Sequence, residues 1–342
     1  MRGISPGKEN EVSGLVLLRK KAGVTSFETL NLIKKAFSTS RVGHTGTLDK
    51  FAQGLLLVLA GRAAKLARWF SSCDKNYEGT IRFGIETDTL DPEGISVAEA
   101  PVPSRQEIEA VLPQFRGTIL QAPPAYSAIH IAGKRASELA RAGIIPEMKK
   151  RPVAIYAFDL LSYDPPYARI HVHCSSGVYI RSLARDLAIS VQSRAHLVSL
   201  ERTQIAGFPL SASYEAGDSL AAGGPFSALR PIDTGCFEAL GLPILLVDES
   251  AVQKMIHGKN LDYIVNEKAI RYPASRIPDP FRVEKTGTIT AGVFLDTGQS
   301  QGTGGGFIGI IEKKAGKWTY GYVYAASGGA CQKGPELPDA CP

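Results

Sequence analysis

The sequence predicts an α+β protein with two domains, and three observations support this fold class. The chain has 342 residues, about twice the length of a typical domain of roughly 150 residues. Segments in which apolar and polar residues alternate, as in half-buried strands, occur among segments with the apolar period of helices. Residues 211–242 are rich in Ala, Gly and Ser and have no strong periodicity. We therefore expect a larger domain over 14–240 and a smaller, β-rich domain over 243–325.

Apolar residues in the first hundred positions recur with either the strand period or the helix period. The expected strands are 14–18, 55–59 and 77–83, and the expected helices are 26–38 and 62–70. Thr25 and Glu28 form a capping box that begins the first of these helices. Its apolar face is predicted to contain Phe27, Leu30, Ile33 and Phe37.

The expected helix 62–70 has two different faces. The residues predicted to pack inward are Ala63, Leu66, Ala67 and Phe70. The opposite face carries Arg62, Lys65 and Trp69, so it is a basic surface that includes an aromatic ring. Ordinary solvation and contact with a nucleic acid both explain such a face.

The middle of the chain continues the mixed pattern. Residues 87–94 collect carboxylates, but they lack the ligand order of a calcium loop, so we expect a turn. Residues 123–151 form a cationic excursion with a short helix near 135–141. A strand at 169–174 and a helix that begins near Ile180 follow.

The smaller domain is expected to contain short strands and one helix. The strands are 244–247, 292–295, 307–311 and 320–324, and the helix ends near Ile256. The Gly-rich run 298–306 is not completed by Lys-Ser/Thr or by a helix, so it predicts a hairpin loop and no phosphate site. The tails 1–13 and 326–342 are expected to be disordered.

Two segments carry the positive charge of the chain. Residues 1–85 hold 14 Lys and Arg against 6 Asp and Glu, and residues 134–151 hold 6 against 2, although the whole chain has a net charge of +6. Such a concentration favours a polyanionic partner, because neutralised phosphates release counterions. Solvated helix faces explain the same charge equally well.

Apolar runs and cysteines suggest the compartment. The longest apolar runs, such as 55–60, are far shorter than the roughly 18 residues of a membrane span, and the start of the chain has no signal-type apolar core. The five cysteines are widely spaced and form no Cys-x-x-Cys pair; they are Cys73, Cys174, Cys236, Cys331 and Cys341. We expect reduced thiols and a cytoplasmic protein without a membrane contact.

His171 and His173 alternate beside Cys174, and on a strand both imidazoles lie on one face, as a metal site requires. No complementary ligand motif lies nearby. We therefore expect Ile170, Val172 and Cys174 to form the buried side of a strand, and we expect no metal. A metal-dependent hydrolase stays as the least favoured class of function.

The segment 41–49 is the most unusual part of the sequence. Two glycines free the backbone beside His44, two hydroxyls and Asp49. A capped turn between a helix and a strand accounts for this composition as well as a functional loop does.

These residues resemble the active-site motif of the TruB-type tRNA pseudouridine synthases. The matching run is Gly43-His-Thr-Gly-Thr-Leu-Asp49, and further matching segments follow in the family's order: 61–66, 75–77, 87–89, 126–129, 133–135, 151–153, 174–181, 195–197 and 202–203. The resemblance is strong from residue 14 to about 210. It implies a mixed, largely antiparallel catalytic sheet and a C-terminal PUA-like RNA-binding domain at 243–325.

The resemblance implies that one uridine in the T-loop of tRNA, at position 55, is isomerised to pseudouridine. Asp49 matches the nucleophile, and Arg181 matches the cation that keeps it ionised. Tyr77 matches the residue that stacks on the flipped base and helps to remove the C5 proton. The implied enzyme is an isomerase that uses no metal and no organic cofactor.

Further residues match positions that contact the substrate. Tyr179 and Leu200 match the base pocket, and His44 matches the residue that fills the space of the extruded nucleotides. The cations expected to contact RNA are Lys20, Arg62, Lys65, Lys134 and Arg151. The excursion over 124–151 matches an insertion that folds over the T-arm. The implied partner is tRNA, bound by a monomer without an obligate protein partner.

The chain also departs from the family pattern. Lys50 replaces the usual proline after the catalytic Asp, and the other departures are Lys21, Phe51, Gln53, His130, Ser176 and Glu201. They bear on RNA affinity more than on the chemistry, and Lys50 is expected to contact a phosphate. A non-catalytic RNA chaperone that remodels tRNA is the second class of function. That class has no need of Asp49, Tyr77 and Arg181 together.

Overall fold

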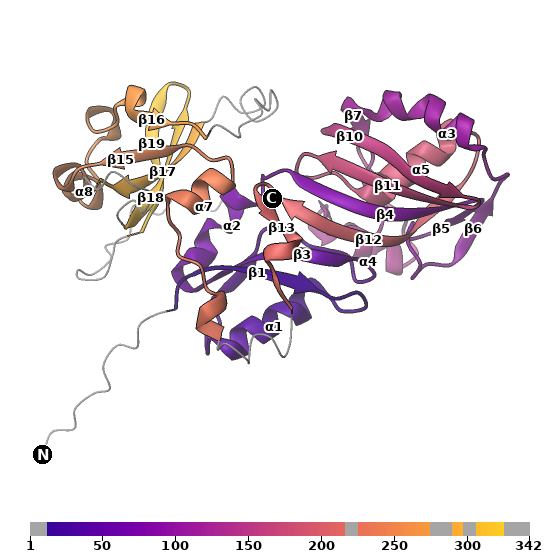
Figure 1. The fold of residues 1–342 in the computed structure, drawn as a ribbon, viewed down its shortest axis with the longest axis horizontal. Helices are drawn as coiled ribbons and strands as arrows, with labels where there is room; N and C mark the ends of the chain where they lie inside the picture. The colour runs from indigo at the N-terminus through magenta and orange to yellow at the C-terminus, as the bar shows by residue number, and fades with distance from the viewer. Residues whose placement is uncertain (1–11, 216–224, 274–288, 297–305, 325–342) are drawn as a thin grey trace, which may run out of the picture.

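The structure is a computed structural model, and it describes residues 12–215, 225–273, 289–296 and 306–324. Two large β-sheets, with helices packed against them, make up most of the described chain (Figure 1). The expected hairpin loop lies almost wholly outside the described residues, and so do most of the two tails. Val12 and Ser13, which we expected to be disordered, are placed: Ser13 Oγ accepts a hydrogen bond from the Ala63 amide at 3.1 Å.

The larger sheet is mixed and largely antiparallel, as predicted. Its main path runs β14-β1-β3-β12-β4-β11-β10-β7, with β2 on β3 and β13 on β12. The strands are β1 (Gly14–Lys20), β2 (Val42–His44), β3 (Gln53–Ala60), β4 (Lys75–Phe83), β7 (Gly117–Gln121), β10 (Arg151–Asp164), β11 (Tyr167–Cys174), β12 (Ala195–Ile205), β13 (Phe208–Pro209) and β14 (Tyr214–Glu215). Only β1 with β14 and β3 with β12 pair in parallel in the described part of this sheet.

Helical segments pack against both faces of the larger sheet. The helical segments before residue 215 are α1 (Ser26–Ala36), η1 (Gly61–Leu66), α2 (Ala67–Phe70), α3 (Arg105–Val111), η2 (Leu112–Phe115), α4 (Ala136–Arg141), α5 (Ile180–Ser190) and η3 (Leu210–Ala212). Ile33 of α1, Ile108 of α3 and Leu183 of α5 are fully buried in one core with β4 and β11. The capping box of Thr25 and Glu28 begins α1 as predicted.

Strands β1 and β3 are buried on both faces. Alternate residues of β1 enter two different cores: Val16 and Leu18 face the core of α1, while Leu15 and Leu17 face the second sheet. Burial on both faces explains why these strands are continuous apolar runs rather than alternating ones. The alternating pattern of β4, by contrast, is that of a strand with one half-exposed face.

The smaller sheet confirms the strands predicted after residue 243. Its order is β16-β15-β17-β18-β19, from β15 (Ile244–Val247), β16 (Ile270–Arg271), β17 (Ile289–Leu295), β18 (Phe307–Lys314) and β19 (Lys317–Val323). The helical segments that accompany it are α7 (Thr234–Ala239), α8 (Glu249–Ile256), η5 (Leu261–Tyr263) and η6 (Glu267–Ala269), whereas Ala228 of η4 (Pro225–Ala228) is buried in the core of the larger sheet. Phe237 of α7 is fully buried in a core that both sheets share.

The segment 62–70 differs from the prediction. It is a 3-10 helix followed by the short helix α2, and Trp69 is buried rather than exposed. Its indole Nε1 donates to Glu312 Oε1 at 2.8 Å, so Trp69 packs against the smaller sheet, and Figure 1 shows α2 and α7 between the two sheets. The prediction was wrong because it assumed one α-helix and because a partner 243 residues away carries no local signal.

Phe27 also differs from the prediction. Its side chain is 64% exposed, and the ammonium of Lys34 lies 4.7 Å from the ring centroid. Leu30, Ile33 and Phe37 are buried as expected. On β11, Ile170, Val172 and Cys174 are buried, which confirms the prediction for that strand.

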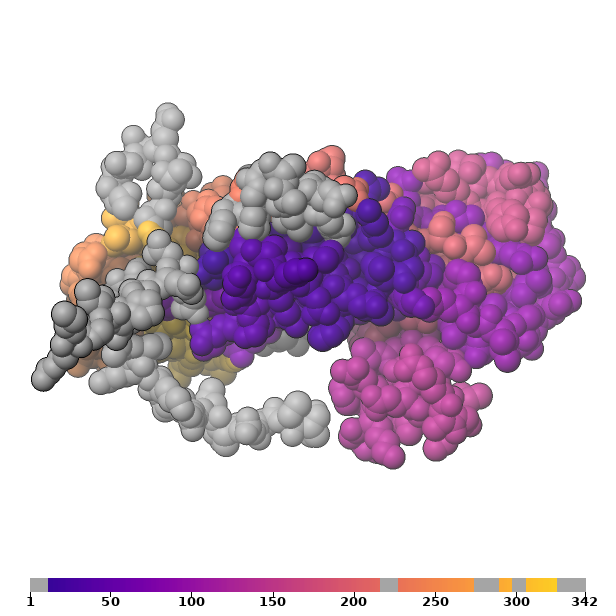
Figure 2. Space-filling view, turned by 90° about the horizontal axis from the view of Figure 1, so that it is seen from below, coloured from indigo at the N-terminus to yellow at the C-terminus, as the bar shows by residue number. Residues whose placement is uncertain are grey.

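Two short hairpins extend from the larger sheet. One pairs β5 (Ile85–Thr87) with β6 (Ser96–Glu99), and the other pairs β8 (His130–Ile131) with β9 (Lys134–Arg135). The segment that contains β8, β9 and α4 stands out from the body as a separate lobe (Figure 2). This lobe is the cationic excursion of the sequence, and its helix lies where it was expected.

Candidate active site

A cavity of about 440 Å³ lies where the loop 45–49 meets the larger sheet. Its walls come from this loop, from β4 and β12, from the start of α5, and from the lobe that contains α4. Five of the residues expected in the site line it together: Asp49, Tyr77, Tyr179, Arg181 and Leu200. These residues are up to about 150 positions apart in the sequence, and the fold places them around one space.

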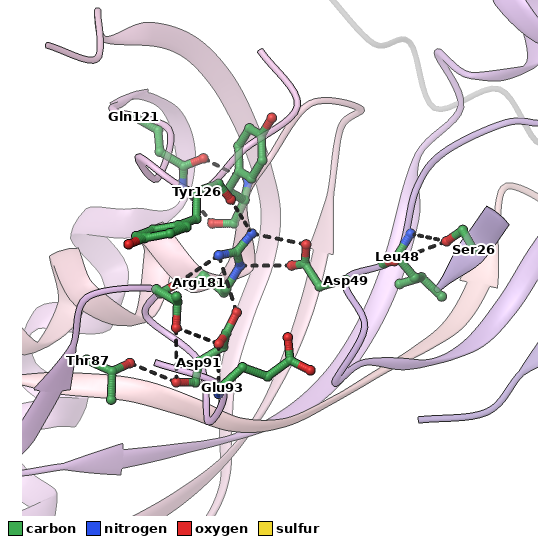
Figure 3. A network of polar contacts seen from close by, with 11 residues as sticks. Ser26, Leu48, Asp49, Thr87, Asp91, Glu93, Gln121, Tyr126 and Arg181 are labelled. Atoms are coloured by element: carbon green, nitrogen blue, oxygen red, sulfur yellow. Dashed lines mark hydrogen bonds and ion pairs between the residues drawn. The ribbon is translucent and has the colours of Figure 1, made fainter. Parts of the chain in front are cut away.

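Asp49 and Arg181 form a bidentate ion pair at this cavity (Figure 3). Arg181 Nε donates to Asp49 Oδ2 at 2.8 Å, and Nη2 donates to Oδ1 at 3.0 Å. The Arg181 side chain is 4% exposed, whereas that of Asp49 is 38% exposed. The pair therefore presents the Asp49 carboxylate to the cavity with a permanent cation behind it.

The backbone around Asp49 is fixed by several hydrogen bonds. Ser26 Oγ, at the start of α1, both donates to the Leu48 carbonyl and accepts from the Leu48 amide, each at 3.0 Å. Lys20 Nζ donates to the carbonyl oxygens of Lys21, Lys50 and Ala52. Lys20 is fully buried, and burial lowers its pKa to about 8.

Lys20 was expected to contact RNA, and the structure corrects this. A fully buried ammonium whose partners are backbone carbonyls is not available to a phosphate. Its place in the fold is to hold the chain that directly follows Asp49.

A second carboxylate, Asp91, lies against Arg181. The distance from Asp91 Oδ2 to Arg181 Nη1 is 3.4 Å, and the Asp91 side chain is 8% exposed. Thr89 Oγ1 and the Glu93 amide donate to Asp91 Oδ1, and Figure 3 shows Asp91 below the Arg181 guanidinium and Asp49 to its right. Burial raises the pKa of Asp91, while the hydrogen bond from Thr89 and the charge of Arg181 oppose the rise.

Arg181 also donates to two backbone carbonyls, those of Thr89 at 2.7 Å and Tyr126 at 3.0 Å. Residues 87–94 form a turn, as predicted, but the sequence analysis missed the role of Asp91. The resemblance over 87–89 was the available signal, because it marked this turn as part of the family's motif.

Aromatic and apolar side chains form the rest of the cavity wall. Tyr77 is 8% exposed and Leu200 is 6% exposed. Burial raises the pKa of the Tyr77 phenol. The backbone of Tyr179 is fixed by Gln121, whose side chain accepts from the Tyr179 amide at 2.8 Å and donates to its carbonyl at 3.1 Å.

Two further buried cations line the cavity, Lys75 and Arg202. Lys75 Nζ donates to the Ser71 carbonyl at 3.0 Å and to the Cys73 carbonyl, and burial lowers its pKa to about 8. Gly54 has a φ of +110°, and a Cβ there would lie 2.4 Å from the Arg202 carbonyl oxygen. Only glycine therefore allows β3 to approach Arg202 so closely.

The remaining expected residues do not line the cavity. His44 is half-buried, its Nδ1 accepts from the Gly46 amide at 3.2 Å, and burial lowers its pKa. Lys134 is exposed on the lobe. Arg151 donates to the Gly177 carbonyl at 2.7 Å, and its guanidinium lies 5.2 Å from the Tyr179 ring centroid.

Arg62 and Lys65 contact the smaller sheet and the residue that follows it. The guanidinium of Arg62 lies 4.5 Å from the Tyr324 ring centroid, and the Lys65 ammonium lies 5.6 Å from that of Tyr322. The sequence analysis expected both cations to face RNA. In the structure each of them is next to an aromatic ring, although Lys65 is also exposed to solvent.

The departures at Lys50, Gln53 and Glu201 lie outside the cavity lining. The ammonium of Lys50 is 3.6 Å from Glu93 Oε1. Glu201 accepts hydrogen bonds from Arg19 at 2.8 Å and from Gln53 at 3.2 Å.

The described residues contain no candidate metal site and no candidate membrane-spanning helix. No group of three or more His, Cys, Asp or Glu side chains there is arranged to hold a metal ion. No helix in the same part of the chain is both long and apolar enough to cross a membrane.

The chain is similar in sequence to proteins of one known family. Residues 34–180 match the family model described as TruB family pseudouridylate synthase (N terminal domain). The chain is 48% identical over 204 residues to tRNA pseudouridine synthase B of Borreliella burgdorferi, which covers 59% of this chain and 72% of that protein. It is 38% identical over 256 residues to the protein of the same name from Stutzerimonas stutzeri, covering 73% of this chain and 83% of the relative.

Two solved structures have the same fold. The first is a Cbf5–Nop10–Gar1 complex, with a TM-score of 0.62 and 20% identity over 91% of this chain and 82% of the other. The second is an H/ACA RNP bound to a substrate RNA, with a TM-score of 0.61 and 18% identity over 91% of this chain and 84% of the other. At these identities the likeness establishes the fold alone.

Proposed function

The chain belongs to the TruB family of pseudouridylate synthases, and from this premise we propose that it isomerises the T-loop uridine at position 55 of tRNA to pseudouridine. The observation that carries the proposal is the bidentate pair of Asp49 and Arg181 at the cavity. The family fixes the class of reaction, uridine to pseudouridine in tRNA. The position of the uridine and the roles of the residues are proposals.

The reaction replaces an N-glycosidic bond by a C-glycosidic bond, so uracil must be detached, turned and rejoined through C5. Asp49 is proposed as the nucleophile, because its carboxylate is accessible from the cavity while Arg181 holds it in place by two hydrogen bonds. The cavity of about 440 Å³ has room for a nucleotide that has left the base stack.

The cavity wall suits a flipped base. The Tyr77 ring offers a face for stacking, which replaces the stacking that the base loses in the loop, and Leu200 adds an apolar surface. Tyr77 is also proposed to take the C5 proton after the new bond has formed. Tyr179 completes the pocket, and Gln121 fixes its backbone.

The T-arm of tRNA is the proposed partner. The lobe of residues 124–151 stands next to the cavity, since Arg135 and Arg141 of this lobe line it, and it carries exposed cations. Arg and Lys side chains that neutralise phosphates make binding strongly dependent on salt. We propose that the lobe closes over the RNA backbone while the base enters the cavity.

The test is tritium release from T-arm RNA that contains 5-tritiated uridine, compared between wild type and Asp49→Ala at matched RNA binding. Wild type should release tritium and the variant should not. Arg116→Gln is a matched control, because the Arg116–Asp159 ion pair is on the surface and outside the cavity lining. If wild type binds the RNA and releases no tritium, the function as an RNA chaperone or a different target uridine replaces the proposal.

A further inference from the structure

Arg202 is a second buried arginine at the candidate active site, and the proposed chemistry gives it no role so far. Its side chain is 1% exposed and lines the cavity. Nε donates to the Leu55 carbonyl at 2.7 Å, and Nη2 donates to the Gly46 carbonyl at 3.0 Å. One side chain thus joins strand β3 to the loop that leads to Asp49. A guanidinium has five N–H donors, so these two bonds leave donors for a third partner.

The phenol of Tyr77 is the neighbour best placed to be that partner. Arg202 and Tyr77 are paired directly across β12 and β4, and both line the cavity. Directly opposite residues in an antiparallel pair have Cβ atoms about 4.5–5.5 Å apart, within reach of two long side chains. Burial raises the pKa of the Tyr77 phenol, and the charge of the Arg202 guanidinium opposes this rise.

The charged and titratable groups around the phenol come from three elements. Burial raises the pKa of Tyr77, and Arg202 on β12 is the main opposing influence. Cys174 on β11 and Asp49 in the loop both act in the same direction as burial. Arg202 therefore counteracts surroundings that would otherwise keep the phenol protonated, and an arginine stays charged at any working pH.

We propose that Arg202 is a positioning residue for the proton transfer at C5 of the uracil: it holds the Tyr77 oxygen at the cavity wall and stabilises the phenolate during the transfer. This inference rests on the proposed function and on Tyr77 as the base. The phenol first loses its proton to solvent. The phenolate then takes the C5 proton, and the C5–H electron pair restores the C5–C6 double bond. N1 of the new pseudouridine takes up a proton from solvent, so the isomerisation balances.

The experiment compares single-turnover pseudouridine formation on T-arm RNA whose target uridine carries either hydrogen or deuterium at C5. The proteins are wild type, Arg202→Lys, Tyr77→Phe and the double variant. Lysine keeps the charge, but it cannot reach three partners from one planar group. Glu201→Gln is the matched control, because Glu201 precedes Arg202 on β12 and contacts Arg19 and Gln53 instead of the cavity.

We expect a rate roughly 100-fold lower in Arg202→Lys, the contribution typical of a general base. The deuterium isotope effect should rise in Arg202→Lys and in Tyr77→Phe, because C5 deprotonation becomes rate-limiting. The double variant should form pseudouridine no more slowly than Tyr77→Phe, because Arg202 acts through Tyr77. The single-turnover rate of Arg202→Lys should increase with pH over a range in which the rate of wild type is constant. Glu201→Gln should match wild type.

Three outcomes would overturn the proposal. One is a slower Arg202→Lys with the wild-type isotope effect, which a merely structural role predicts. Another is a double variant whose rate falls by the product of the fold-decreases seen in Arg202→Lys and Tyr77→Phe. The last is a wild-type isotope effect in Tyr77→Phe, which decides the matter even if the Arg202 variants do not fold. Absence of pseudouridine with wild type would instead contradict the proposed function itself, so the two failures are distinguishable.

Discussion

Replacing Asp91 by asparagine tests whether the second carboxylate on Arg181 contributes to catalysis. Asparagine preserves the shape and the acceptor for Thr89 and for the Glu93 amide, and it removes only the charge. Asp91 does not line the cavity, so its loss should act through Arg181 rather than on the RNA. We therefore expect a lower kcat and an unchanged KM.

The magnitude follows from the distance and the burial. The charged atoms of Asp91 and Arg181 are 3.4 Å apart, and both side chains are less than a tenth exposed. Opposite charges at about 4 Å interact by about 4 kcal/mol at an effective dielectric constant of about 20. The cost of burying the carboxylate removes part of this gain. A net loss of about 2 kcal/mol corresponds to a roughly 30-fold lower kcat.

The assay is steady-state pseudouridine formation on T-arm RNA, with thermal unfolding to verify the fold. Glu86→Gln is the control, because the Glu86–Arg194 pair, 3.7 Å apart, lies on the surface near the same turn. A raised KM with an unchanged kcat would mean that Asp91 binds RNA. An unchanged kcat and KM would mean that the charge of Asp91 makes no contribution to catalysis through Arg181.

Three further predictions concern RNA affinity, the contact between the sheets and pH. Lys50→Ala should reduce the slope of log affinity for tRNA against log salt concentration by about 1. Lys50 is 54% exposed, so its ammonium can leave Glu93 and bind a phosphate instead. An unaltered slope would refute a contact between Lys50 and a phosphate. Trp69→Phe should cost about 2 kcal/mol and lower the melting temperature by several degrees, because Glu312 loses a buried donor; an unchanged melting temperature would contradict this. Burial lowers the pKa of Lys75 from 10.5 to about 8. Between these two values the unfolded chain holds a proton that the folded chain has lost, so stability rises with pH. The melting temperature of wild type minus that of Lys75→Met should therefore increase as the pH rises through this window. A difference that stays constant with pH would refute the lowered pKa of Lys75.

The sequence predicted helices and strands well where the interacting residues are close together in the chain. The capping box that begins α1 joins Thr25 and Glu28, three residues apart, and the alternation of β4 is visible within nine residues. Trp69 was misplaced because the residue that binds its indole is Glu312, far along the chain. A helical wheel also assumes an α-helix, and residues 61–66 form a 3-10 helix instead.

Polar residues of the site were harder to predict for a physical reason. Lysine and arginine are seldom fully buried, so composition alone predicts that Lys20 and Arg202 are exposed. Both are buried because backbone carbonyls from separate segments satisfy their donors. Which carbonyls lie next to these side chains depends on how the segments pack, and the pattern of apolar residues does not predict it. The resemblance marked the segments, but only the fold shows which side chains meet.

The departures from the family pattern also gain a physical explanation once the chain is folded. Gln53 and Glu201 are both atypical, and they are paired across β3 and β12. Gln53 donates to Glu201, which also binds Arg19, so the carboxylate that replaces the usual arginine has two partners of its own. Because neither residue lines the cavity, the two changes compensate each other at the edge of the site and leave the Asp49–Arg181 pair intact. The pair of departures therefore alters the charge of the surface around the site rather than the chemistry within it.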